Sequence, residues 1–527
     1  MRPRTTFQTP PPPPSLRPAY AHTLRDTEKC HLPAPPSSRP PGSRARSGLN
    51  QDSAPSVTIS KGHTDGDGKV SQMKGRSRVL GCLLSAVIAT PIVQASASAG
   101  TVSEPPSRRN ALYVLHLFSN DITTFTLDSK GRPTPIDRVT TGTGPRGFVF
   151  TPDGRRAYTA NGGDGTISGY TVDDRGKLAP LGEPVPVGGQ VPFGIAIAPD
   201  GKTLYTANLN SGTVSALSVD ANGKPHLIGT PVPTGSPQPR TVSASADGRF
   251  VFVSHGLPAK GRADDMVVLA VRPDGGLKRT TIPNVPVGSG GNGSDITPDG
   301  RFIYVASTGS DVVYGYRIAH DGSLSSIPGS PFPTAVFPED AAVTPDGRHL
   351  YVTSPNHDTT VTRNVTAFSI GRDGVLQAVP GSPFESAGAS VGITPSRDGR
   401  RLYVGNFETH DLAAFDIGKT GVLTQLAGSP FPTGGSNPTF QGVSVPPDQG
   451  PKAAFQSTIT DRTARFDGTA SADPDGTIAR YDWTFGDGAA LPNGGPYPTH
   501  TYRRPGTYQA TLTVTDDEGC ATALIFT

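Results

Sequence analysis

Cysteine, methionine and tryptophan are scarce in this sequence: 527 residues include three Cys, three Met and one Trp. No Cys-x-x-Cys-His segment occurs, which excludes covalently attached haem. The histidines are scattered without His-Glu-x-x-His spacing, so we expect no zinc site and, more broadly, no metal or cofactor. A Gly-x-Ser-x-Gly nucleophile elbow is also missing. The glycine-rich run at 288–293 lacks the Lys-Ser/Thr and the helix that a phosphate-binding loop requires.

Glycine and proline are abundant instead, with 64 Gly and 55 Pro, together about 23% of the chain. So much turn chemistry argues against a helical protein. Hydrophobic residues make up 34% of the sequence, which is enough for a core and too little for a protein with many membrane spans. We therefore predict an all-β protein.

The N-terminal part of the chain divides into two segments. Residues 1–72 are rich in proline and basic residues, which predicts disorder or an extension wrongly included in the sequence. Residues 73–99 begin with Met73 and a basic stretch, continue with an apolar run from Val79 to Val93, and end in small residues. This order is typical of a secretory signal peptide, so we expect a secreted or cell-surface bacterial protein without a membrane span in its mature form. The alternative is a basic tail before an uncleaved anchor.

Removing residues 1–99 changes the net charge from +3 to about −5, so the remaining chain is mildly acidic. It gives no electrostatic reason to expect a nucleic-acid partner. We predict a monomer whose partner is an extracellular protein or polysaccharide. Cys30 and Cys82 would be lost with the N-terminus, which would leave Cys520 without an internal disulfide partner; it could be free, buried or paired between chains.

A phrase of about 47 residues recurs from residue 110 onward, and each copy contains an Asp-Gly turn between apolar strands. The turn aspartates lie 47, 47, 52, 47 and 52 residues apart: Asp153, Asp200, Asp247, Asp299, Asp346 and Asp398. Several short strands per repeat of this length indicate the blades of a β-propeller. In the first unit we expect strands at 148–150, 156–160, 166–172 and 178–187.

Incomplete units flank the six complete ones. Leu112–Val114 and Ile122–Leu127 look like the second and third strands of a blade, and Gly442–Val445 looks like the first. If these segments pair, they complete a seventh blade that closes the ring with strands from both ends of residues 106–448. The short, protected edges of such a ring limit aggregation.

The second strands of the blades carry a common signature, as in Tyr158-Thr159-Ala160-Asn161 and Tyr403-Val404-Gly405-Asn406. These segments resemble the YVTN repeats of bacterial surface propellers. The wider group includes seven-bladed lactonases similar to 6-phosphogluconolactonase. This resemblance implies the fold over about residues 106–448 and leaves the activity open, because propellers serve many functions.

Residues 451–527 have a different pattern, with strands of period two separated by Gly and Asp turns. We expect a small β-sandwich. The segments Tyr481–Gly488 and Thr513–Asp516 resemble the PKD domain, the immunoglobulin-like module named after polycystic kidney disease proteins. Trp483 is expected in its core, with ligand contact as the alternative. Five aspartates could bind calcium or simply cap turns: Asp473, Asp475, Asp487, Asp516 and Asp517.

Blade connectivity places the candidate site residues on one face. If all Asp-Gly turns lie on one face, the connections between blades and the loops after the second strands must lie on the other, at the mouth of the central channel. The expected ligand-binding residues are Arg146, Arg240, Asn292, Glu339, Asp340 and His357, with Asp295 nearby. The weak catalytic candidates are Arg146, Arg240, Glu339 and His255, and the loops also carry His116, Asn161, Asn208 and His410. Solvated loop side chains without a function are the alternative. The loops between Ser254 and Asp265 and between Ser354 and Asn364 are long enough to border the mouth.

Two functions follow as hypotheses. The main one is a non-catalytic binding or interaction scaffold, with the PKD domain as a spacer or adhesive arm toward protein, wall polymer or polysaccharide. The alternative is an extracytoplasmic lactonase that hydrolyses a sugar-lactone-like substrate at the channel mouth, with an acid or base and positive charge for the oxyanion. Related lactonases typically read Pro-Arg-His where this chain reads Pro145-Arg146-Gly147, which disfavours catalysis.

Overall fold

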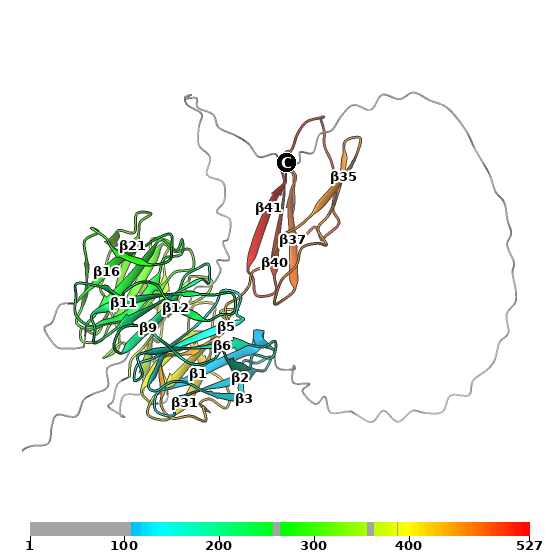
Figure 1. Cartoon of the computed structure of the whole chain (residues 1–527). Coiled ribbons are helices and arrows are strands. Elements are labelled where there is room, and N and C mark those ends of the chain that lie inside the picture. The colour runs from blue at the N-terminus through cyan, green and yellow to red at the C-terminus, as the bar shows by residue number, and fades with distance from the viewer. Residues whose placement is uncertain (1–106, 257–263, 356–362, 387, 527) are drawn as a thin grey trace, which may run out of the picture.

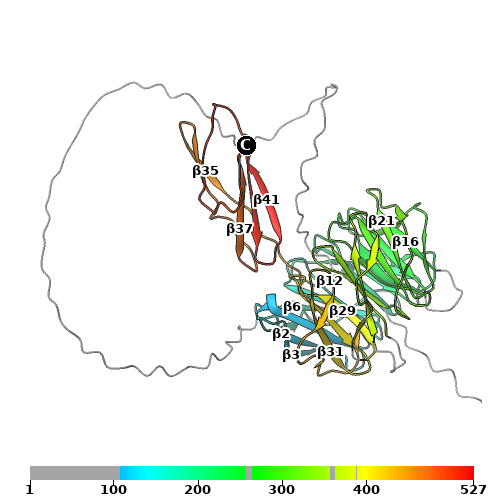
Figure 2. The same ribbon diagram turned by 180° about the vertical axis from the view of Figure 1, so that it is seen from behind.

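The computed structural model describes residues 107–256, 264–355, 363–386 and 388–526. Strands dominate this part of the chain, and the 3₁₀ turn η1 (Arg108–Asn110) precedes the first of them. Figures 1 and 2 show a broad body of radiating sheets and a narrower body formed by the last strands of the chain. Within the described ranges, no helix has the length and apolar character needed to span a bilayer.

Six blades each follow the chain order, with the inner strand first. Blade 1 contains β4 (Pro145–Phe150), β5 (Arg156–Asn161), β6 (Thr166–Val172), β7 (Leu178–Pro180) and β8 (Val185–Pro186). Blade 2 contains β9 (Pro192–Ile197), β10 (Thr203–Asn208), β11 (Thr213–Val219), β12 (Pro225–Leu227) and β13 (Val232–Pro233). Blade 3 contains β14 (Pro239–Ala244), β15 (Phe250–His255), β16 (Asp264–Val271), β17 (Leu277–Arg279) and β18 (Val285–Gly288).

The next three blades repeat this arrangement. Blade 4 contains β19 (Gly291–Ile296), β20 (Phe302–Ser307), β21 (Val312–Ile318), β22 (Leu324–Ser326) and β23 (Phe332–Pro333). Blade 5 contains β24 (Asp340–Val343), β25 (His349–Thr353), β26 (Arg363–Ile370), β27 (Leu376–Ala378) and β28 (Phe384–Glu385). Blade 6 contains β29 (Ser390–Pro395), β30 (Arg401–Asn406), β31 (Asp411–Ile417), β32 (Leu423–Gln425) and β33 (Phe431–Pro432).

Blade 7 joins the two ends of the propeller, as the sequence predicts. Its sheet has the order β3 (Pro133–Thr140), β2 (Asp121–Leu127), β1 (Ala111–His116) and β34 (Pro438–Ser444). The antiparallel contact between β1 and β34 pairs Tyr113 with Ser444 and Val114 with Val443. The first and last strands of the propeller therefore hydrogen-bond to each other, and the expectation of a closed seven-bladed ring is confirmed.

The outer strand of each complete blade differs from the expectation. We predicted one continuous strand over 178–187, whereas the structure has two short strands, β7 and β8, that both pair with β6. Gly182 lies between them with a φ of 124°, a conformation that L side chains rarely adopt. The glycine allows the chain to turn away from the ladder and then return to it.

The tyrosines of the YVTN-like signature join neighbouring blades. The hydroxyl of Tyr158 in blade 1 donates to the carbonyl of Gly223 in blade 2 at 2.7 Å, and Tyr403 in blade 6 donates to Gly131 in blade 7 at 2.8 Å. Equivalent bonds run from Tyr113, Tyr205, Tyr304 and Tyr351 to the next blade. The signature tyrosine therefore binds six of the seven blades to the next one, whereas blade 3 has Phe252 at this position.

The C-terminal body is a β-sandwich of two sheets. One sheet contains β35 (Gln456–Thr460), β36 (Thr463–Asp467) and β39 (Thr499–Thr501). The other contains β38 (Ala490–Leu491), β37 (Ile478–Thr484), β40 (Ala510–Asp516) and β41 (Ala521–Phe526). Trp483 is 1% exposed, packs edge-on against Phe455 and donates from Nε1 to the carbonyl of Gly495, so its predicted place in the core is confirmed.

Candidate functional site

One position of the repeat gathers four of the polar residues that the sequence singled out. It is the second residue of the inner strand in six blades and the residue just before β24 in blade 5. Because the inner strands surround the channel and begin on the face opposite the Asp-Gly turns, these side chains share one level near the mouth. We call this set the mouth ring: Arg146, Phe193, Arg240, Asn292, Glu339, Val391 and Thr439.

Phe193 is the central member of the mouth ring. The guanidinium carbon of Arg146 lies 4.5 Å from the centroid of its ring, and that of Arg240 lies 4.9 Å away. The phenyl ring also belongs to an apolar cluster with Val391 of blade 6 and Phe440 of blade 7. Side chains from blades 1, 2, 3, 6 and 7 are thus linked through Phe193, which is fully buried. This packing makes the channel mouth a filled layer.

Two charged members of the mouth ring, Arg240 and Glu339, are almost fully buried, at 1% and 7% exposure. Burial raises the pKa of Glu339 well above its usual value, and attraction to Arg240 opposes this rise. Burial lowers the pKa of Arg240 to about 9, while Glu339 favours the charged form and Arg146 disfavours it. Arg240 is therefore cationic at neutral pH. An acid held in reach of a fixed cation is a pairing suited to proton transfer beside a developing negative charge.

Hydrogen bonds between blades fix Asn292 and Glu339 in place. The Asn292 side-chain amide donates to Thr308 Oγ1 at 2.7 Å, and Thr308 donates in turn to the carbonyl of Pro338 at 2.8 Å. The amide of Gly293 donates to the carbonyl of Glu339. Glu339 therefore sits on a backbone that blade 4 holds directly, which limits its freedom to move.

A small cavity of about 30 Å³ lies among the inner strands. Many of its lining residues follow members of the mouth ring by one to three positions in the sequence. Asp295 and Asp340 line it, but their carboxylates also accept from the backbone amides of Val343 and Ile393 on neighbouring inner strands. These two aspartates hold adjacent blades together. Gln441 also lines the cavity, with 4% exposure and a φ of 48°, and neither amide atom of its side chain has a partner among the described residues. The volume suffices for a water molecule that could satisfy it.

The loop residues that follow the second strands make structural contacts. His116 Nδ1 lies 2.8 Å from Asp121 Oδ1, and Nδ1 of His255 lies 3.1 Å from the carbonyl of Asp265, where burial lowers the pKa of the imidazole. His410 Nδ1 accepts from the amide of Asn437. The side chains of Asn161 and Asn208 bond to Thr and Ser side chains of the third strand. His357 and the central parts of both long loops fall outside the described residues.

Sequence reasoning found four of the seven members of the mouth ring: Arg146, Arg240, Asn292 and Glu339. It missed Phe193, Val391 and Thr439, and it also missed Gln441. Searching for polar residues alone excluded the two apolar members. A direct alignment of the seven segments that precede the inner strands would have shown all seven at one position, since they are spaced by about one repeat.

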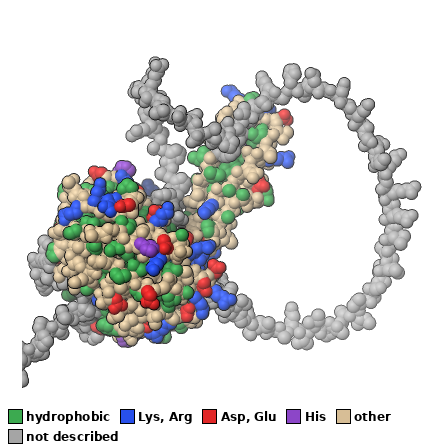
Figure 3. Space-filling view, in the orientation of Figure 1, with side chains coloured by type: hydrophobic (Ala, Val, Ile, Leu, Met, Phe, Trp, Pro, Cys, Tyr) green, Lys and Arg blue, Asp and Glu red, His purple; other side chains and the backbone are tan. Residues whose placement is uncertain are grey.

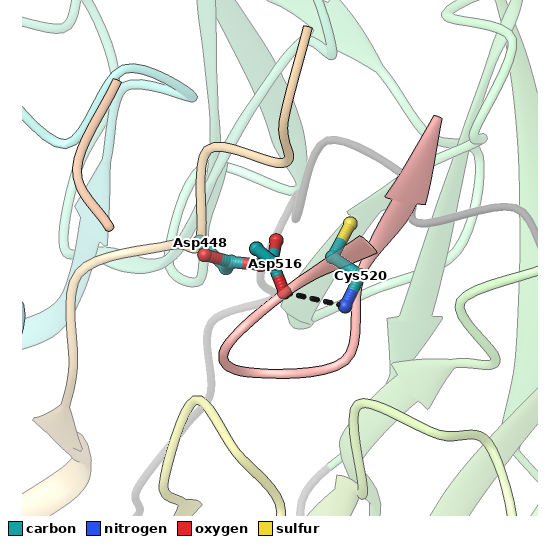
Figure 4. A group of neighbouring side chains, drawn as sticks. All are labelled: Asp448, Asp516 and Cys520. Atoms are coloured by element: carbon teal, nitrogen blue, oxygen red, sulfur yellow. Dashed lines mark hydrogen bonds between the residues drawn. The ribbon is translucent and has the colours of Figure 1, made fainter. Parts of the chain in front are cut away.

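Acidic side chains gather in the PKD-like body and could hold a cation. Carboxylate oxygens of Asp473, Asp516 and Glu518 lie within 4.8 Å of one another. Asp448 and Cys520 form a second group with Asp516, and Figure 4 shows Asp516 accepting from the amide of Cys520. Cys520 is buried and disulfide-bonded.

The five aspartates considered as calcium ligands do not form one site. Asp473 and Asp516 belong to the acidic group, whereas Asp475 contacts Arg397 of the propeller. Asp487 bonds to His500, and Asp517 pairs with Arg109. Oxygen donors of this kind suit a hard cation, but only two of the five contribute them in one place.

Comparisons with known proteins agree with the architecture. The sequence model of the lactonase family with a seven-bladed β-propeller matches residues 108–292, 270–373 and 294–441, and that of the PKD domain matches residues 446–526. A segment of 72 residues is 43% identical to collagenase ColA of Clostridium perfringens; the match covers 13% of this chain and 6% of the collagenase.

Solved propellers share the fold. The periplasmic gluconolactonase PpgL of Pseudomonas aeruginosa is 21% identical, with a TM-score of 0.53, over 64% of this chain and 99% of that chain. A protein of Bacteroides fragilis described as a 6-phosphogluconolactonase is 19% identical, with a TM-score of 0.54, over 62% of this chain and 96% of that chain. By the extent of its match to the family, the chain belongs to the lactonases with a seven-bladed β-propeller, here joined to a PKD domain.

Proposed function

We propose that the protein is an extracytoplasmic lactonase that opens a sugar-lactone-like ring at the mouth of the propeller channel. The observation that carries this proposal is the mouth ring, where Arg146 and Arg240 lie over Phe193 and Arg240 interacts electrostatically with Glu339. Membership of the lactonase family supports the reaction class. The signal-like segment at 73–99 supports export. This reading reverses the order of the two hypotheses that the sequence alone suggested.

Lactone hydrolysis needs a base for water and positive charge for the oxyanion. In the proposed reaction, Glu339 as the carboxylate takes a proton from water while the water oxygen bonds to the lactone carbonyl carbon. Arg146 and Arg240 stabilise the negative charge on the carbonyl oxygen. The ring C–O bond then breaks, the ring oxygen receives the proton, and a hydroxy acid is released. The raised pKa of Glu339 makes it a better proton acceptor than an exposed carboxylate.

Access is the main requirement that the resting mouth ring does not meet. Arg240 and Phe193 are buried, so a substrate must displace the phenyl ring or the side chains above it. Gly147 stands where similar lactonases place a histidine, so Glu339 would have to carry the proton transfers alone. Hydrolysis of glucono-δ-lactone and related lactones by wild-type protein and Arg240→Ala tests the proposal. Turnover that falls in the variant supports it, and a broad panel without turnover contradicts it.

A non-catalytic scaffold remains the second candidate, because the PKD domain brings a second surface of its own. Charged side chains of both signs are interspersed over the face seen in Figure 3, without one dominant patch. Such a surface suits contacts with wall polymer or polysaccharide through many weak interactions. Pull-down on cell-wall polysaccharide, combined with an absence of lactone turnover, would favour this function over the enzymatic one.

A further inference from the structure

The residue that follows the second strand makes the same backbone contact in six blades. Its amide donates to the carbonyl two positions before the mouth-ring residue of that blade, which fixes the connection that carries this residue. The donors are Leu117, Gly162, Leu209, Gly256, Thr308 and Phe407, and the acceptors, in the same order, are Asn437, Gly144, Val191, Gln238, Gly290 and Ala389. The contact therefore belongs to the repeat and holds the mouth ring in place from below each connection.

Blade 5, which carries Glu339, departs from this pattern. Its equivalent donor, the amide of Ser354, bonds to the carbonyl of Asn364 in the third strand instead. The amide of Glu339 donates to the carbonyl of Thr353 at 2.8 Å, and the carbonyl of Glu339 accepts from the amide of Gly293 in blade 4 at 2.8 Å. The connection that precedes Glu339 is therefore not held by the bond that the repeat supplies in the other blades.

The side chain of Thr308 in blade 4 anchors this connection across the boundary between the blades. Its backbone makes the ordinary bond of the repeat to Gly290, while its Oγ1 donates to the carbonyl of Pro338 at 2.8 Å. Pro338 directly precedes Glu339, and Thr308 is fully buried. The other blades have leucine, glycine, serine or phenylalanine at the position of Thr308, so the repeat does not require this threonine.

The same hydroxyl group also orients Asn292. A threonine hydroxyl has a single proton to donate, and in Thr308 this proton is directed to the carbonyl of Pro338. Toward Asn292 the hydroxyl oxygen can therefore act only as an acceptor, and it receives the side-chain amide at 2.7 Å. This bond fixes which end of the Asn292 amide faces Thr308. One buried hydroxyl thus connects two members of the mouth ring, Asn292 and Glu339, that belong to adjacent blades.

From these contacts we propose that Thr308 is a positioning residue, which holds Glu339 and Asn292 in the geometry that lactone hydrolysis at the mouth ring requires. The inference rests on the proposed function, because it concerns the step in which Glu339 takes a proton from water. That step requires the carboxylate within hydrogen-bond reach of the water, and a displacement of about 1 Å can lower a rate by about 100-fold. Thr308 acts on this step through the backbone that precedes Glu339.

Hydrolysis of glucono-δ-lactone by the full chain tests this role in Thr308→Val, which keeps the shape of the side chain and removes its hydroxyl. We expect kcat to fall by about tenfold or more with KM nearly unchanged, because Glu339 is displaced while the rest of the mouth ring stays in place. Thr308→Ser retains the hydroxyl and should restore most of the lost activity. Burial holds the pKa of Glu339 high, so the rise of kcat/KM with pH that reports its ionisation should move to lower pH in Thr308→Val, where the loosened side chain gains contact with water.

Thr433→Val is the matched control. Thr433 is also fully buried, and its Oγ1 donates to the carbonyl of His410 at 2.8 Å. Both valine variants remove a buried threonine hydroxyl, so both should lower the melting temperature, but Thr433→Val should keep the kcat and the pH profile of wild type. If Thr308→Val yields too little folded protein, Thr308→Ala removes the same hydroxyl with less bulk and carries the same expectation.

The outcomes separate the role of Thr308 from the proposed function. If Thr308→Val retains the kcat of wild type while Glu339→Gln is inactive, the positioning role is overturned and the proposed function stands. A loss of activity that Thr308→Ser does not restore, or that leaves the pH profile unchanged, would also overturn the positioning role, because a general loss of structure would then explain it. If wild-type protein shows no turnover, the proposed function fails, and the role of Thr308 in it fails at the same time.

Discussion

Arg397 offers the sharpest test of how the two domains are joined. Its guanidinium is 6% exposed and contacts Asp448 and Asp475, with Glu518 at 3.6 Å. Replacing it by methionine keeps much of the side-chain volume but leaves these carboxylates without their cation. Breaking a buried ion pair in this way typically costs about 3–5 kcal/mol. For a unit the size of the PKD domain, each kcal/mol shifts the melting temperature by roughly 4–8 °C, so the expected loss is at least about 12 °C.

Trp483 makes the measurement specific, because the only tryptophan of the chain lies in the PKD core. Its fluorescence during heating reports the unfolding of that domain alone. Arg400→Met is the matched control, since Arg400 follows the same turn, is 75% exposed and lies 3.9 Å from Asp398. Exposed pairs of this kind contribute about 0–1 kcal/mol. Equal midpoints for Arg397→Met, Arg400→Met and wild type would refute the claim that Arg397 stabilises the docked PKD domain.

Three further predictions concern the same fold. Burial raises the pKa of Glu518 to about 7 and that of Asp516 to about 6. Their contribution to stability is therefore present at low pH and lost as pH rises through these values. The melting temperature reported by Trp483 should decrease as the pH is raised from about 5 to 8, and the decrease should be smaller in Glu518→Gln. A melting temperature that increases over this range would contradict the prediction. Trp483→Ala should lower the free energy of unfolding of the PKD domain, measured in urea, by about 3–5 kcal/mol. A loss below about 1 kcal/mol would place the indole outside the core. Tyr403→Phe, which removes the bond to Gly131, should cost about 1 kcal/mol of propeller stability, whereas the exposed Tyr497→Phe should have no effect.

The fold was largely readable from the sequence because each blade repeats the same local chemistry. Asp-Gly turns mark the junction of the first two strands, and the orphan segments at 112–114 and 442–445 indicate closure, which the pairing of β1 with β34 confirms. The division of the outer strand was missed, since a glycine with positive φ interrupts it without changing the apolar pattern. The role of the signature tyrosines was also missed, because their acceptors lie in the next blade, more than 60 residues away in most cases.

The candidate site was predictable in part. Charged residues in the connections between blades pointed to Arg146, Arg240 and Glu339, but burial of the mouth by Phe193 depends on side chains from opposite blades that no local pattern reveals. The sequence contains an indication of the contact between Arg397 and the PKD domain that our prediction did not take into account. Its turn reads Arg-Asp-Gly, whereas four of the other five turns read Pro-Asp-Gly. The arginine that replaces proline in the turn of blade 6 is the residue that contacts the PKD domain.

The most direct test of the proposed function is the rate of glucono-δ-lactone hydrolysis by the full chain, compared with Glu339→Gln. Exposed Glu385→Gln serves as the matched control. General acid–base catalysis by a carboxylate typically contributes 10²–10⁴-fold, so kcat/KM should fall by about 100-fold or more in Glu339→Gln and stay unchanged in the control. Hydrolysis no faster than the spontaneous rate, or equal rates in wild type and Glu339→Gln, would contradict a lactonase site at the mouth ring.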